Sequence, residues 1–158
     1  MPTPDDAVLM QRALAAARAG LDHGAGPFGA LVADEHGRIV AVAANAVLVR
    51  NDPTAHAEVL AIRRAAAVRG TFVLHGCTLV TTCAPCVMCT GAIHWAGLAR
   101  VVAGARSTDA ESIGFVEGPV GFDGAAFLRA RGIAYEPDVE RDAAIALLRA
   151  YTGPIYNG

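Results

Sequence analysis

Residues 77–105 read CTLVTTCAPCVMCTGAIHWAGLARVVAGA, and this stretch decides the expected fold. The apolar run Cys77–Thr82 is typical of a buried strand, and Ala99–Ala105 is typical of a second one. Between them a helix is expected over Pro85–Ala96, because proline suits the first helical position and Gly97 ends the pattern. A strand, a helix and a strand in this order predict a βαβ unit with parallel strands.

The sequence before this unit predicts a helix and an antiparallel hairpin. Thr3 suits the N-cap of a first helix that continues until Gly20 ends it. The apolar segments Phe28–Ala33 and Ile39–Ala46 flank a polar, glycine-containing turn, which is typical of two antiparallel strands joined as a hairpin.

A second helix is expected over Ala55–Arg69, with Thr54 as its N-cap. After the βαβ unit the chain is expected to be irregular from Arg106 to Gly124. The remaining predicted elements are a short helix near 125–130, a strand near 133–135 and a last helix that Asp138 caps. Together these elements predict the α/β class, with a mixed sheet of about five strands, helices on both faces and one domain over residues 1–158.

The charge balance and the apolar pattern exclude several classes of protein. The 13 basic residues are all arginine and the acidic residues number 15, so a net charge of -2 offers no bulk attraction to nucleic acid. No apolar run reaches the roughly 18 to 20 residues of a membrane span, and the acidic N-terminus lacks the features of a secretory signal. We therefore expect a soluble, cytoplasmic protein whose clustered cysteines are reduced and available as metal ligands.

Two short motifs carry the candidate chemistry, His56-Ala57-Glu58 and Pro85-Cys86-Val87-Met88-Cys89. Cysteines three residues apart on a helix project from the same face, and a helix N-terminus favours their thiolate form. With a nitrogen from His56, they make three protein ligands for Zn²⁺ and leave the fourth tetrahedral position to water, as catalytic zinc requires. Glu58 lies two residues beyond His56, off its helical face, so we expect it beside the metal-bound water and not as a ligand.

The charges of the ligands assign a role to Glu58. Two thiolates cancel the charge of Zn²⁺, so a metal held in this way acidifies its water less than one held by three neutral histidines. A nearby base is then required. Glu58 is expected to take the proton of the water, deliver it to a ring nitrogen and later help to protonate departing ammonia.

Two other interpretations of the motifs are open at this point. In a closed structural zinc site, Cys77 or Cys83 would be the fourth ligand. In a metal-free redox site, Cys86 and Cys89 would form a thiol pair. Neither interpretation gives His56 and Glu58 a common purpose.

The two motifs, together with Pro27-Phe28-Gly29-Ala30, resemble those of the cytidine deaminase-like superfamily, whose zinc deaminases carry H-x-E and P-C-x-x-C segments. The resemblance runs from about Gly26 to Phe115. It implies a three-layer α/β/α fold and one Zn²⁺ per chain held by His56, Cys86 and Cys89. It also implies Glu58 as the proton shuttle and a homodimer.

Within this superfamily the chain is most similar to bacterial guanine deaminases, which implies a free nucleobase as substrate. The residues that carry this similarity are Phe28, Trp95, Thr108-Asp109-Ala110 and Gly114-Phe115. The resemblance implies that Phe28 and Trp95 wall the pocket, that Asn45 binds the base and that the Ala84 carbonyl receives the amino group. It implies a second assisting carboxylate, for which Glu117 is the best counterpart, and it adds Ala57 and Phe115 to the pocket.

Each pocket residue also has a structural interpretation. Phe28 and Trp95 could be core residues, Asn45 could satisfy backbone groups at a strand end, and Glu117 could be a solvated loop acid. Ala84, His94 and the C-terminal tail depart from the guanine deaminase pattern, although His94 could line the pocket. Isoguanine, cytosine or an aminotriazine as substrate, tRNA adenosine deamination and a zinc-stabilised structural module therefore remain alternatives.

Overall fold

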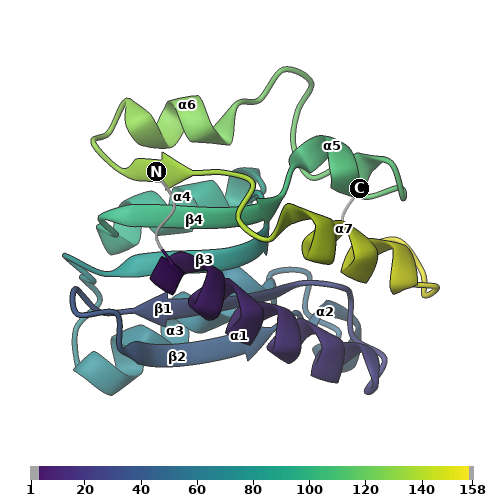
Figure 1. Cartoon of the computed structure of the whole chain (residues 1–158), viewed down its shortest axis with the longest axis horizontal. Coiled ribbons are helices and arrows are strands. Elements are labelled where there is room, and N and C mark those ends of the chain that lie inside the picture. Colours follow the sequence, from purple (N-terminus) through teal and green to yellow (C-terminus); the bar gives the residue numbers. More distant parts are fainter. Residues whose placement is uncertain (1–3, 157–158) are drawn as a thin grey trace.

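Five strands form one mixed sheet in the order β2-β1-β3-β4-β5 in the computed structural model, which describes residues 4–156 (Figure 1). The parallel βαβ unit and the hairpin predicted from the sequence are both present, since β1 pairs antiparallel with β2 and β3, whereas β3, β4 and β5 run parallel. The strands are β1 (Gly29–Ala33), β2 (Ile39–Ala44), β3 (Thr78–Cys83), β4 (Arg100–Ala105) and β5 (Ala134–Glu136).

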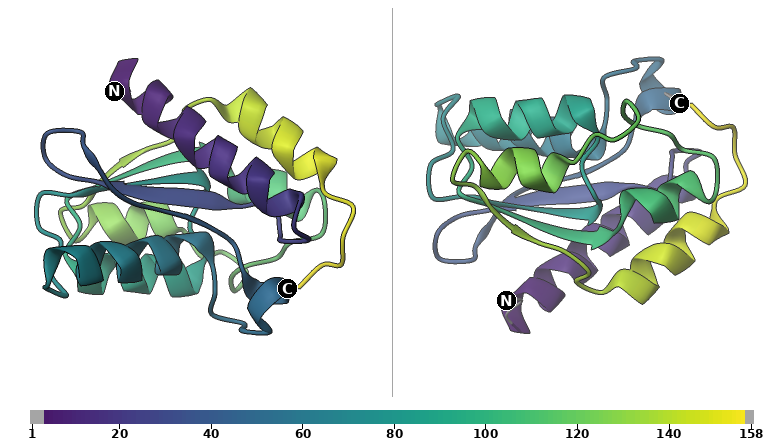
Figure 2. Two further views of the ribbon diagram at one scale, coloured as in Figure 1. Left: turned by 90° about the horizontal axis from the view of Figure 1, so that it is seen from below. Right: turned by 90° about the horizontal axis from the view of Figure 1, so that it is seen from above.

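Helices cover both faces of this sheet and make the α/β/α arrangement (Figure 2). One face carries α1 and α7, and the other carries α3, α4 and α6, which pack side by side. The helices are α1 (Pro4–Leu21), α2 (Val47–Arg50), α3 (Ala57–Arg69), α4 (Val87–Ala96), α5 (Ser107–Glu111), α6 (Gly124–Arg129) and α7 (Arg141–Ala150). No helix within residues 4–156 is long and apolar enough to cross a membrane.

The central strands β1, β3 and β4 are buried on both faces, which explains the apolar sequences of β1 and β4. Gly29 allows α1 to approach β1 closely, because a β-carbon at this position would collide with the Ala13 carbonyl oxygen. A partly buried ion pair adds a second link between α1 and the sheet, with Arg100 Nη1 of β4 at 2.6 Å from Asp6 Oδ1. The core therefore fixes α1, β1 and β4 relative to one another.

Two short helices were not predicted, and three helix starts differ from expectation. Helices α2 and α5 each comprise about one turn, too short for apolar periodicity to reveal them. The N-cap of α3 is His56, because the Thr54 hydroxyl donates to Asp52 Oδ1 at 2.7 Å instead of capping the helix. The predicted N-cap Thr3 lies outside the described residues, and α1 extends one residue beyond Gly20.

The other two helices also begin later than predicted. Helix α4 begins at Val87 with Cys86 as its N-cap, so Pro85 lies outside the helix. Helix α7 begins at Arg141 with Glu140 as its N-cap. Asp138, the predicted cap, instead accepts two hydrogen bonds from Arg106, a residue 32 positions away in the sequence.

Candidate metal centre and active site

The three predicted metal ligands lie at the N-terminal ends of two neighbouring helices. His56 and Cys86 have extended backbone conformations and are the N-caps of α3 and α4, whereas Cys89 lies in the first turn of α4. The prediction that both cysteines project from one helical face is therefore corrected, because Cys86 precedes the helix. Its Sγ accepts a hydrogen bond from the Cys89 amide at 3.4 Å, so the helix terminus contributes directly to stabilising the thiolate.

The distances between the ligand atoms fit a tetrahedral zinc ion. His56 Nδ1 lies 3.5 Å from Cys86 Sγ and 3.5 Å from Cys89 Sγ. Zinc bonds of about 2.3 Å to sulfur and about 2.1 Å to nitrogen, at a tetrahedral angle, place these atoms about 3.6 Å apart. The three ligand atoms all lie within 4.8 Å of one another, and all three residues are buried.

The electrostatics of the cluster favour a bound cation. A hydrogen bond from Cys89, and then the contact with His56, lower the pKa of Cys86 to about 4. Burial alone would lower the pKa of His56, but the Cys86 thiolate and Glu58 raise it to about 9. A group that is readily a thiolate thus lies beside an imidazole that gains from a positive charge, and a divalent cation bound to both would take the place of a proton.

Glu58 lies against the ligands but is not one of them. Its Oε2 is 3.5 Å from Cys89 Sγ, and its Oε1 accepts a hydrogen bond from the Thr81 hydroxyl at 3.1 Å. Burial raises the pKa of this carboxyl, and the Cys86 thiolate raises it further. An acid with this burial and a charged neighbour is typical of a proton-transfer group.

The structure does not support a closed site with four protein ligands. The Cys83 thiol points to the Arg106 carbonyl oxygen at 3.8 Å, and Cys77 Sγ accepts from Arg69 Nη1 at 3.4 Å. Among residues 4–156, the cluster that could hold a metal comprises His56, Cys86 and Cys89 alone. A tetrahedral ion at this place would keep one open position, as catalytic zinc requires.

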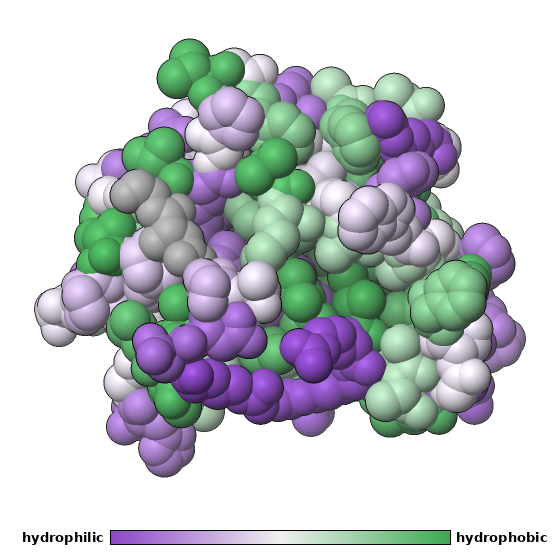
Figure 3. All heavy atoms as spheres, turned by 180° about the vertical axis from the view of Figure 1, so that it is seen from behind, coloured by the Kyte–Doolittle hydropathy of each residue, from purple (hydrophilic) through white to green (hydrophobic). Residues whose placement is uncertain are grey.

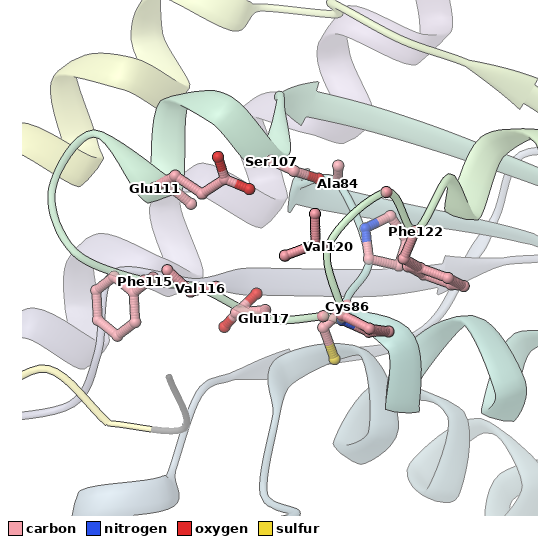
Figure 4. Close-up of a pocket in the computed structure, with 14 residues that line it drawn as sticks. Ala84, Cys86, Ser107, Glu111, Phe115, Val116, Glu117, Val120 and Phe122 are labelled. Carbon is pink, nitrogen blue, oxygen red and sulfur yellow. The ribbon is translucent and has the colours of Figure 1, made fainter.

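Two cavities share Cys86 and Glu117 in their walls. Figure 4 shows the residues that line the first of them. This cavity has a volume of about 370 Å³ and also contacts Ala84 and Phe115. The second has a volume of about 510 Å³ and reaches His56. Burial raises the pKa of Glu117 to about 8, and the negative charge of Glu58 contributes to this rise.

Comparison with known proteins identifies the family. Residues 3–105 match the model described as the cytidine and deoxycytidylate deaminase zinc-binding region. The chain belongs to this family. It is therefore a zinc-dependent hydrolytic deaminase, and the quartet of His56, Cys86, Cys89 and Glu58 lies inside the matched region.

Three proteins illustrate the similarity of this deaminase to known sequences and structures. Guanine deaminase from Bacillus subtilis is 48% identical over 108 residues, which are 68% of this chain and 69% of the relative. The tRNA-specific adenosine deaminase of Aquifex aeolicus is 40% identical over 60% of this chain and 62% of its own length. A crystal structure of NE0047 in complex with 2,6-diaminopurine superimposes with a TM-score of 0.88 at 41% identity, covering 96% of this chain and 85% of that one.

Several expected pocket residues of the deaminase lie together. The Phe28 and Phe115 rings contact edge to face at 5.1 Å, and both side chains are buried. The backbone amide of Asn45 donates to the Phe28 carbonyl oxygen at 2.9 Å, and the side-chain oxygen Oδ1 of Asn45 accepts from the backbone amide of Val47 at 3.1 Å. Ala57 is fully buried at the first position of α3. The side-chain oxygen of Asn45 thus satisfies a backbone group after the end of β2, which is the structural role that the sequence left open.

Trp95 lies apart from this group. Its side chain is 83% exposed, and it borders neither of the two cavities that meet at Cys86. The interpretation of Trp95 as a core residue is wrong, and within one chain it does not wall the site. Helix α4 buries Cys89, Ile93 and Ala96, whereas Trp95, two residues from Ile93, points away from that face. His94 is also exposed and packs on Phe127 of α6 at 6.0 Å between ring centroids, away from the pocket.

Tyr156 is an aromatic residue near the site that the sequence analysis missed. Its ring packs edge to face on Phe115 at 5.0 Å, and its hydroxyl is buried. Within residues 4–156, this hydroxyl is the buried side-chain polar atom that has no hydrogen-bond partner. The available signal was an Ile-Tyr pair in a glycine- and proline-containing tail, but no local pattern connects that tail with the metal ligands.

Proposed function

We propose that the chain removes an amino group from a free purine base, with guanine as the leading substrate. The observation that carries this proposal is the Glu58 carboxylate, held 3.5 Å from a ligand sulfur of a buried three-ligand site. The similarity to a guanine deaminase over two thirds of both chains supports the substrate class. The similarity to a protein solved with 2,6-diaminopurine, a purine that carries amino groups, adds to this support.

Zinc held by His56, Cys86 and Cys89 would supply a bound water of lowered pKa and a positive charge beside the carbon under attack. Glu58 is placed to accept the proton of that water through Oε2 and to return it to a ring nitrogen and then to the departing ammonia. Burial raises the pKa of Glu58, which makes its carboxylate a stronger proton acceptor than an exposed one. The net reaction consumes one water and releases one ammonia.

The pocket roles belong to the same proposal. Phe28 and Phe115 offer aromatic surface for the base, and Ala84 and Ala57 offer backbone polar groups. The Asn45 side chain, anchored through its carbonyl oxygen, can present its amide nitrogen to a ring acceptor. Glu117 borders both cavities and is buried enough for its carboxyl to serve as a second proton carrier.

An ammonia-release assay on metal-replete protein tests the proposal. Guanine is expected to be the best substrate in a panel with isoguanine, 2,6-diaminopurine, cytosine, an aminotriazine, guanosine and cytidine. Faster turnover of cytosine or an aminotriazine would show that this base, and not a purine, is the preferred substrate. Absence of ammonia release from every compound would contradict the proposal as a whole.

Deamination of adenosine in tRNA is the second candidate function, and the similarity to the Aquifex aeolicus enzyme favours it. The net charge of -2 disfavours it, since a protein that neutralises several phosphates gains affinity from basic residues. The discriminating measurement is tRNA binding between about 50 and 200 mM salt. Tight binding that falls steeply with salt would favour the tRNA reaction.

We further propose that one domain over residues 1–158 acts as a homodimer in the cytoplasm. The layer of α3, α4 and α6 exposes Trp95, and Phe72, which follows α3, is 80% exposed. Figure 3 views the molecule from this side and shows hydrophobic residues among polar ones. A second copy that covered this layer would remove these rings from water. The four cysteines are free thiols, which is consistent with a reducing compartment.

A further inference from the structure

Thr81 forms a hydrogen bond with Glu58, the proton-transfer group of the site. It lies on the central strand β3 and is 1% exposed. Its hydroxyl is 3.1 Å from Glu58 Oε1 and 3.0 Å from the Cys83 carbonyl oxygen. The other Glu58 oxygen, Oε2, faces Cys89 Sγ. The two oxygens of the carboxylate are therefore engaged separately, one by the sheet and the other by the metal centre.

We propose that Thr81 is the positioning residue that fixes the orientation of the Glu58 carboxylate. The proposal rests on Glu58 being the proton shuttle of the proposed function. The terminal torsion of a glutamate is broad, so packing alone does not fix the direction of its oxygens. A hydrogen bond at Oε1 removes this freedom and keeps Oε2 beside the sulfur of Cys89, a predicted metal ligand.

The anchor of the hydroxyl is itself rigid. Thr81 pairs with Ala30 of β1 on one side and with Ala103 of β4 on the other, so its backbone is held by two neighbouring strands. Threonine is stiff at χ1, which limits the positions that the hydroxyl can take. The second contact, to the Cys83 carbonyl, joins the hydroxyl to the segment that leads into Cys86. Through Thr81, the Glu58 carboxylate is thus linked to the end of β3, which leads into the metal ligands Cys86 and Cys89.

A hydroxyl suits this task better than an amide or a cation. It has one donor hydrogen and two acceptor lone pairs. It can donate to Glu58 as a carboxylate, or accept from Glu58 as a carboxylic acid while it donates to the Cys83 carbonyl. Threonine therefore keeps the same contact through a reaction in which the carboxyl gains and loses a proton, and it adds no charge to the buried site.

The chain offers a matched control on the next residue of the strand. Thr82 is also buried, at 2% exposure, but successive strand residues point to opposite faces of the sheet. Its hydroxyl accepts from the Gly29 amide at 3.1 Å. Thr81→Val and Thr82→Val therefore make the same chemical change at neighbouring buried positions, and the first of these hydroxyls is the one that reaches Glu58.

Crystal structures and steady-state kinetics of zinc-loaded variants test the proposal. In Thr81→Val, the Glu58 carboxylate is expected to rotate, and the distance from Oε2 to Cys89 Sγ to change. Turnover (kcat) is expected to fall by about ten- to a hundredfold, because a misplaced catalytic group costs this much. KM and the zinc content per chain should stay within about twofold of wild type. Thr81→Ser should restore kcat to within about threefold, and Thr82→Val should lower the melting temperature while kcat is kept.

A Thr81→Val structure with Glu58 in its original orientation would overturn the proposal, whatever the kinetics. A loss of kcat that serine does not restore, or that Thr82→Val reproduces, would overturn it too. The orientation of Glu58 in the crystal structure tests the positioning role independently of which substrate is used in the kinetic assay. Full activity of Glu58→Gln would instead refute the proposed function, so the two failures are distinguishable.

Discussion

The phenol oxygen of Tyr156 occupies the space that a β-carbon on Gly26 would need. The two residues come from opposite ends of the chain, and Tyr156 also packs on Phe115 beside the candidate site. Glycine at position 26 is thus what allows the tail to lie over the aromatic cluster. Gly26 lies within the segment that resembles the deaminase family, from about Gly26 to Phe115, whereas Tyr156 lies in the tail beyond that segment.

Replacement of Gly26 by alanine is expected to displace Tyr156 from Phe115. The added methyl group would overlap the phenol, so the free energy of unfolding should fall by about 1–3 kcal/mol, as in other overpacked sites. Thermal and chemical unfolding measure this change. Tyr156→Ala in the same chain should remove most of the penalty, and an equal penalty in both backgrounds would refute the contact.

Gly91→Ala is the control for this experiment. Gly91 lies inside α4, and nothing lies within 4 Å of the position of an added β-carbon. Alanine there should increase stability by about 0.5–1 kcal/mol, because glycine is unfavourable in a helix interior. Opposite signs at positions 26 and 91 would show that the effect comes from Tyr156 and not from the loss of a glycine.

Removal of zinc should destabilise the fold and abolish turnover. A cation at about 1,000 times its dissociation constant stabilises the folded state by about 4 kcal/mol, so a chelator is expected to lower the melting temperature markedly. Cys89→Ser should lose zinc in the same way. Calorimetry and metal analysis test both changes, and an unchanged melting temperature after complete removal of zinc would contradict the expected contribution of the metal.

Glu58→Gln should separate catalysis from structure. Glutamine keeps the shape of the side chain but cannot carry the proton, so kcat is expected to fall by at least about a hundredfold. Zinc content and melting temperature should remain near those of wild type. Full turnover of the variant would show that Glu58 is not the group that carries the proton.

A surface ion-pair network should make stability depend on pH in acid. Hydrogen bonds from Arg141 and Arg106 lower the pKa values of Asp109 and Asp138 below the ordinary value of 3.8. A carboxyl with a lowered folded-state pKa stabilises the fold above its unfolded value, and this stabilisation is lost as the pH falls through the folded value. Stability should therefore decline below about pH 4.

Asp138→Asn tests the origin of this decline. Asparagine tolerates the left-handed backbone at this position, where φ is 65°. The variant should be less stable than wild type at pH 7, and the difference should shrink as the pH falls below about 4. Asp22→Asn, at an exposed position, serves as the control and should follow wild type throughout. A pH-independent difference for Asp138→Asn would contradict the assigned ion pair.

Trp95→Glu tests the proposed dimer. A charge in the middle of a covered apolar layer is unfavourable, so the variant should dissociate to monomers at concentrations where wild type is dimeric. Light scattering after gel filtration measures the mass of both. Identical masses for the two proteins would place the interface elsewhere or exclude it.

Much of the fold could be predicted because the signals are local. The hairpin and the parallel unit follow from apolar runs separated by turn residues, and the quartet of His56, Cys86, Cys89 and Glu58 follows from motif spacing. The one-turn helices α2 and α5 could not be predicted, since a single turn has no period. The N-cap of α7 was misplaced because Asp138 pairs with Arg106, a residue distant in the sequence.

The sequence by itself determined the metal ligands and the nearby acid, because residue type and spacing decide which atoms can bind one cation. Only the tertiary structure decided what surrounds them. It exposed Trp95, which the resemblance had placed in the pocket, brought Tyr156 from the tail to Phe115 and Gly26, and set the Thr81 hydroxyl against Glu58. These contacts join segments far apart along the chain, and no local pattern encodes the distance between them.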